Sequence, residues 1–209
     1  MTTPILDSLF NFDNAAQRWR DSSTGRFVSN EAVQDEMFQH SDATHSSLES
    51  LTRSLYSGDI SLAQWQVAVA SELKDAHLAQ AMYAVGGRAN MGFAEFGRVG
   101  QTLREQYAYL DKFAQDIAAG NVSESMALSR IAHYGDSCKQ SYWNEYIEKS
   151  SGLLDWNLGA TDEQNCGDCP RIAGGSPYTK ETIPSSPADG ATQCKGRCRC
   201  YVTRRGERD

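Results

Sequence analysis

The chain contains 209 residues, with 20 basic and 27 acidic side chains, a formal charge of −7 and 40% hydrophobic residues. This length fits one domain with appended segments and is enough to bury a core, so a multidomain assembly is not expected. No apolar run approaches the roughly 20 residues of a membrane span. Residues 1–12 also lack the basic and apolar regions of a signal peptide, so we expect neither membrane attachment nor signal-peptide secretion.

The charge is unevenly distributed along the chain. Residues 166–209 carry eight basic and five acidic side chains, a balance of +3, whereas the remaining 165 residues carry −10. An acidic body is repelled by a phosphate backbone, which disfavours general coating of nucleic acid. The short basic tail can still contact DNA or an acidic partner surface.

The first 30 residues mix polar side chains with scattered aromatics and show little periodicity. They predict an extended N-terminal arm with a turn at residues 21–25. Two alternatives remain open: the arm packs on its own domain as a surface strand or loop, or it becomes ordered against a neighbouring subunit.

Residues 31–150 have helical periodicity. Residues 31–56 predict one helix, or two with a break near residues 40–45. Ser61 and Gln64 then form a capping-box pattern, which predicts a helix that runs to about Val85 and ends at two glycines.

A stretch punctuated by glycines leads into the next predicted helix, which has one apolar face over residues 103–117 and ends at Gly120. Ser123 is the expected N-cap of a long amphipathic helix from Glu124 to near Ser150. Cys138 falls on the apolar side of that helix and is predicted to be a buried, inert thiol.

Residues 151–209 differ in composition from the helical body. Residues 153–159 predict a short strand that enters a turn, and four of the five prolines follow. Such a segment cannot build a core by apolar burial alone. Five of the six cysteines lie in it: Cys166, Cys169, Cys194, Cys198 and Cys200.

The cysteine spacing is that of two knuckles separated by a 24-residue loop. Cys166 and Cys169 form the first knuckle, and the other three cysteines can complete a tetrahedron with one to spare. Tetrahedral sulfur ligation suits Zn²⁺ or iron, and we take structural zinc as the expected ion. Its binding free energy of ~10 to 16 kcal/mol is enough to order a segment without a core.

Disulfides are the alternative, but five clustered cysteines without a signal sequence favour a metal. The four histidines, His40, His45, His77 and His133, are expected at the surface or its boundary. The chain has none of the nucleotide-binding, hydrolase or metalloprotease motifs, and a closed shell of cysteines leaves no open metal position. We therefore expect no enzymatic activity, although the spare cysteine leaves room for redox switching.

Residues 156–175, with the prolines at 184 and 187, Gly190 and the ending from Cys194 to Cys200, resemble the C-terminal part of phage head-morphogenesis or minor head proteins of the Mu F-like family. The resemblance covers about 50 residues. It implies a non-enzymatic virion component that assists assembly or genome delivery near the portal or inside the head.

Two departures from the family pattern leave alternatives open. Many members end in a His-x-x-Cys-Arg-Cys step, whereas Cys194 here precedes Cys198 by four residues, so the last two ligands are unassigned. The chain is also shorter than many members, so it can be a full morphogenesis factor or a related head, neck or tail structural protein.

Together these patterns predict a mainly α protein with an extended arm (residues 1–30), a helical body (31–150) and a zinc-stapled C-terminal module with a short β element (151–209). The expected role is assembly within a tailed phage, in the virion and in the host cytoplasm during assembly. The expected partners are portal, capsid or neck subunits, with possible self-association, possible contact with genomic DNA and no membrane. The main rival is a zinc-ribbon-like nucleic-acid-binding or regulatory protein that uses Arg197, Arg199, Arg204 and Arg205.

Overall fold

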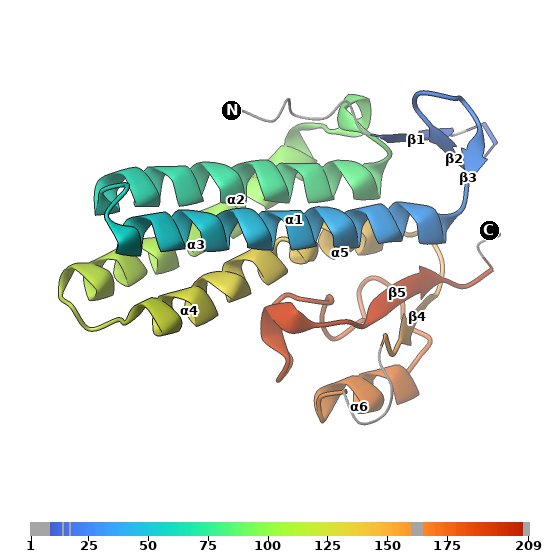
Figure 1. Ribbon diagram of the computed structural model, residues 1–209. Coiled ribbons are helices and arrows are strands. Elements are labelled where there is room, and N and C mark those ends of the chain that lie inside the picture. Colours follow the sequence, from blue (N-terminus) through green and yellow to red (C-terminus); the bar gives the residue numbers. More distant parts are fainter. Residues whose placement is uncertain (1–8, 14, 17, 160–164, 207–209) are drawn as a thin grey trace.

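The computed structural model describes residues 9–13, 15–16, 18–159 and 165–206. The first eight residues of the expected arm therefore lie outside the described residues, as do residues 160–164 of the segment that carries the family resemblance. The protein is mainly α-helical, with the clustered cysteines in a C-terminal module that contains short strands, as the sequence predicts, and it has three further short strands near the N-terminus (Figure 1).

Residues 10–28 form a small antiparallel sheet in the order β1-β2-β3 (Phe10–Asp13, Arg18–Asp21 and Phe27–Val28). Trp19 is buried and meets Phe12 edge to face, with ring centroids 5.3 Å apart. Gly86, at the end of the second helix, has φ +83°, and a Cβ there would collide with Phe12. These residues thus pack on their own domain, which is the first of the two alternatives for the arm.

Helix α1 (Asn30–Ser57) is continuous, without the break that residues 40–45 suggested. Its internal hydroxyls hydrogen-bond to carbonyls one turn earlier: Thr44 Oγ1 donates to the His40 carbonyl at 2.9 Å, and Thr52 Oγ1 donates to that of Leu48 at 2.9 Å. These hydroxyls share the carbonyls with the helical N–H groups and leave the helix continuous.

Helix α2 (Leu62–Val85) begins at the predicted capping box, in which Ser61 Oγ accepts from the Gln64 N–H and Gln64 Oε1 accepts from the Ser61 N–H. After the short 3₁₀ helix η1 (Arg88–Asn90), helix α3 spans Phe93–Ala118. It starts ten residues before its expected apolar face, at the N-cap Gly92, whose N–H donates to Glu95 Oε2 at 2.8 Å. The helix continues through Gly97 and Gly100, where a Cβ would meet only open space. Each glycine costs ~1 kcal/mol of helix propensity, which burial of the opposite face overrides.

The predicted long helix from Glu124 is two helices, α4 (Glu124–Ser137) and α5 (Lys139–Glu148). At the junction the Cys138 N–H bonds to the Gly135 carbonyl three residues earlier, and the Cys138 thiol donates to the same carbonyl at 2.9 Å. Gly135 lies against the His45 backbone, where a Cβ would come within 2.9 Å of the His45 Cα. The close approach of α4 to α1 thus fixes the position of the break.

Helices α1 to α4 enclose one apolar cluster, while α5 contributes to a second cluster that it shares with the C-terminal module. The first cluster consists of Leu48, Trp65, Val69, Leu73, Ala81, Val99, Leu103, Leu110, Phe113, Ala114, Ala127, Ile131 and Tyr134. Within the described residues, no helix has the length and apolarity that crossing a bilayer requires.

The C-terminal module lies against one side of the bundle (Figure 1). It contains strand β4 (Leu154–Asn157), helix α6 (Asp168–Gly174), the 3₁₀ helix η3 (Lys195–Arg197) and strand β5 (Tyr201–Arg204). β4, the predicted short strand, pairs antiparallel with β5 from Leu154↔Arg204 to Asn157↔Tyr201. The sequence analysis identified neither α6 nor the partner strand.

Candidate metal centre

Strand pairing and two short helical turns bring the five clustered cysteines together. The chain leaves β4 toward the first knuckle, where Cys166 precedes α6 and Cys169 lies in its first turn. Cys194 is the residue before η3, and Cys198 and Cys200 connect η3 to β5. Because β5 pairs antiparallel with β4, the pairing brings the second knuckle next to the first.

Three of the sulfurs form a compact triangle. The Sγ atoms of Cys166 and Cys169 are 3.1 Å apart, those of Cys166 and Cys194 are 3.6 Å apart, and those of Cys169 and Cys194 are 4.0 Å apart. Zn–S bonds of about 2.3 Å at tetrahedral angles place sulfurs about 3.8 Å from one another. Two of the three separations, 3.6 and 4.0 Å, are close to this value, and the third is shorter, so the triangle approaches one face of a thiolate tetrahedron.

A second group of sulfurs shares Cys169 with the first. The ligand atoms of Cys169, Cys198 and Cys200 all lie within 4.8 Å of one another. Cys169 is thus central to the cluster, because it belongs to both groups of three sulfurs. The five cysteines can hold a metal ion, in agreement with the sequence analysis.

Hydrogen bonds outside the sulfurs connect the two knuckles. The Gln193 N–H donates to Asp168 Oδ2 at 3.0 Å, and the Gly167 N–H donates to Gln193 Oε1 at 3.2 Å. The Thr192 hydroxyl lies 3.2 Å from the Cys194 sulfur. Such outer contacts orient metal ligands, and the spacing of the cysteines alone does not reveal them.

The two late cysteines differ in their surroundings. A hydrogen bond from the Cys198 thiol lowers the pKa of Cys200 to about 6, and the same bond raises the pKa of Cys198. The backbone N–H of Gly159 also bonds to the Cys200 sulfur. A Cβ at Gly159 would overlap the Arg199 carbonyl, so glycine is required for the two backbones to approach this closely.

The module attaches to α5 through buried aromatic rings and one arginine. The Arg204 guanidinium lies 4.2 Å from the Tyr146 ring centroid, and its Nε donates to Ser150 Oγ at 2.8 Å. Arg205 forms a two-point ion pair with Asp155, at 2.9 and 2.6 Å. Two of the four arginines that the nucleic-acid alternative requires are therefore engaged in contacts within the chain.

The histidines were predicted to lie at the surface or its boundary, and this is wrong for His77. That side chain is fully buried, and its Nδ1 is 2.8 Å from the Ser141 hydroxyl. It lies on the inner side of α2, where burial lowers its pKa to about 4. His133, which is exposed, lines the pocket above the cysteines although no metal-like spacing connects it to them.

Cys138 is buried as predicted, far along the chain from the cluster. Burial raises the pKa of its thiol to about 11, which keeps the thiol protonated and unreactive at neutral pH.

Comparison with protein-family models, with curated proteins and with solved structures gives no match to this chain. The site itself consists of five converging sulfurs, hydrogen bonds between the knuckles, and a docking face on α5.

Proposed function

We propose that the protein is a structural component of a tailed phage particle, in which Zn²⁺ cross-links the two cysteine knuckles within the C-terminal module. The observation that carries this proposal is the convergence of five sulfurs at the positions of the resemblance to minor head proteins. The role is assembly through protein–protein contacts with portal, capsid or neck subunits. The resemblance alone supports the virion part, and the sulfur geometry supports the metal part.

Zinc is the ion that this donor set favours. Thiolates are soft ligands, and tetrahedral sulfur coordination selects zinc or iron over the hard cations. Four protein sulfurs close the coordination shell, so the ion orders the chain and leaves no position for a reacting water.

We assign Cys166, Cys169, Cys194 and Cys200 as the four ligands. These four line a common pocket of 600 Å³, whereas Cys198 is not among the residues of its wall. Cys200 also receives the Gly159 N–H, a bond that favours a coordinating thiolate. Cys198 then remains a buried thiol that donates to Cys200.

Metal analysis and cobalt spectroscopy test the zinc site. Protein purified without chelator is expected to contain about one zinc per chain, and Co²⁺ is expected to give the intense absorption of tetrahedral thiolate ligation. Cys198→Ser is expected to keep that spectrum and Cys200→Ser to lose it. The reverse result would overturn the ligand assignment. An intact protein mass below that of the fully reduced chain would show that the cysteines are paired as disulfides, and would exclude the zinc site.

Mass spectrometry of purified particles tests the virion role. Particles of the phage that encodes the chain are expected to contain it after sedimentation and nuclease treatment. Recovery of the protein only from the soluble fraction would contradict a structural role.

Salt-dependent DNA binding tests the rival function. Arg204 and Arg205 are engaged within the chain, while Lys195, Arg197 and Arg199 occupy exposed positions around the site, where Arg197 also pairs with Asp136 at 3.7 Å. Tight binding to duplex DNA that weakens steeply with salt would favour the nucleic-acid-binding alternative.

A further inference from the structure

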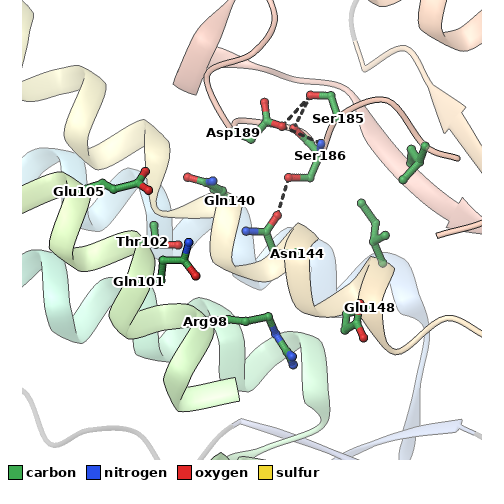
Figure 2. A pocket seen from close by; sticks show the side chains of 12 residues that line it. Arg98, Gln101, Thr102, Glu105, Gln140, Asn144, Glu148, Ser185, Ser186 and Asp189 are labelled. Atoms are coloured by element: carbon green, nitrogen blue, oxygen red, sulfur yellow. Dashed lines mark hydrogen bonds between the residues drawn. The ribbon is translucent and has the colours of Figure 1, made fainter. Parts of the chain in front are cut away.

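A polar pocket of 460 Å³ lies away from the cysteines, between α3, α5 and the loop at residues 183–189. Figure 2 shows side chains from these three elements converging on it. Its volume lies within the range of about 300 to 1,000 Å³ that is typical of ligand sites.

The loop wall of the pocket is built by specific hydrogen bonds. Ser186 Oγ donates to Asn144 Oδ1 at 2.6 Å, which attaches the loop to α5. Asp189 Oδ2 accepts from the Ser185 hydroxyl at 2.7 Å and from the Ser186 N–H at 2.9 Å (Figure 2). The wall is therefore present before any ligand binds, which lowers the entropic cost of binding.

The charge of the lining is negative. Glu105, Glu148 and Asp189 contribute carboxylates, and Arg98 is the one cation among the lining residues that the structure describes. Arg98 is already neutralised, because its Nε and Nη2 donate to the buried Glu145 at 2.8 and 2.6 Å. Lys180 approaches Glu148 only at 3.5 Å, in an exposed pair that contributes little.

The uncharged lining groups suit a peptide. Gln101, Gln140 and Asn144 carry side-chain amides, which can both donate to and accept from a peptide backbone. Among the described residues, the Asn144 amide is hydrogen-bonded through its oxygen, which leaves its two N–H groups for a ligand. Ile147 and Ile183 add an apolar surface beside these polar groups.

We propose that this pocket binds a short segment of a partner protein that carries a basic side chain next to an aliphatic one. The acidic lining selects the cation, the side-chain amides bind the segment's backbone, and the two isoleucines contact the aliphatic residue. The proposal depends on none of the metal ligands, so it stands or falls separately from the zinc site.

A titration followed by NMR tests the proposal on the full-length, metal-loaded chain. The probe is the blocked peptide acetyl-Ala-Arg-Ile-Ala-amide, and the signals are the side-chain NH₂ groups of Asn144 and Gln140. We expect saturable shifts of these signals, and about fivefold weaker binding for each of Glu105→Gln and Glu148→Gln. Asp35→Asn, which removes an exposed acid from α1, is the matched control and is expected to bind as the wild type does.

Three results would overturn the proposal. The first is the absence of saturable shifts in the two NH₂ groups. The second is equal binding of the acidic peptide acetyl-Ala-Glu-Ile-Ala-amide, which would remove the charge argument. The third is spermidine binding as tightly as the basic peptide, which would mean that the pocket recognises a cation without recognising a peptide.

Discussion

The helical bundle and the C-terminal module differ in what holds their chains in place. The bundle buries continuous apolar faces, and its α2 begins at a capping box that satisfies the first backbone donors. The module has short strands and several prolines, and its apolar residues pack largely on the aromatic rings of α5. At its centre are cysteine sulfurs, where a domain of this size normally has aliphatic side chains.

The two regions of the chain are therefore stabilised in different ways. Apolar burial in the bundle is distributed over many residues, so no single contact is essential. In the module the expected metal ligands and the close backbone contacts are few, so the loss of one is expected to remove many others. The four predictions below test this contrast, from the largest expected effect to the smallest.

Cys169→Ser should separate the two regions most strongly. Cys169 belongs to both sulfur groups, so its loss disrupts either four-sulfur arrangement and forfeits much of the ~10 to 16 kcal/mol expected of a structural zinc. Hydrogen exchange should show lost protection in residues 165–206 and retained protection in α1 to α3.

Cys138→Ser is the matched control for this change, because it replaces a cysteine of the bundle and should leave the zinc content at the wild-type value. Unfolding of the bundle together with the module would show that the two regions are one cooperative unit, against the contrast drawn here.

Gly159→Ala should damage the module without touching a sulfur. The new methyl group would overlap the Arg199 carbonyl, so β4 and β5 would have to separate near Cys200, at an expected cost of ~2 to 4 kcal/mol. Urea unfolding and zinc affinity measure the effect. Gly152→Ala, where a Cβ meets open space, should be close to neutral, and equal effects of the two variants would argue against the close approach.

Acid should destabilise the bundle through His77. Burial lowers the folded-state pKa of this side chain to about 4, below its ordinary value of 6.5, so the unfolded chain binds the proton more tightly. The contribution of His77 to stability is complete above pH 6.5 and is lost as the pH falls toward 4, by at most about 3 kcal/mol.

His77→Gln should remove this part of the pH dependence, measured as the difference in unfolding free energy between wild type and variant at pH 7 and pH 4.5. Parallel pH profiles for wild type and His77→Gln would refute the assignment.

Ser61→Ala should have the smallest effect. The substitution removes the side-chain half of the capping box at the start of α2, at a cost of ~1 kcal/mol. Thermal unfolding of the bundle is the measurement, and zinc affinity should not change. A loss of zinc affinity would show that the start of α2 and the module are coupled.

Local sequence signals predicted the helices well where a cap and an apolar face coincide. Ser61 with Gln64 placed the start of α2, and Ser123 placed that of α4. The break at Cys138 escaped prediction because it depends on the approach of Gly135 to α1, a contact between residues far apart in the sequence. The burial of His77 escaped for the same reason, since Ser141, its partner, lies on another helix.

The sequence by itself determined that five cysteines gather in one C-terminal segment, because thiol spacing is a local property. It also determined the mainly helical class, which follows from periodicity. Only the tertiary structure decided that Cys169 is central to both sulfur groups, that Gly159 lies against Cys200, and that Arg204 belongs to the docking face on α5. These features depend on the pairing of β4 with β5 and on packing against α5, which bring together side chains about 40 to 60 residues apart in the sequence.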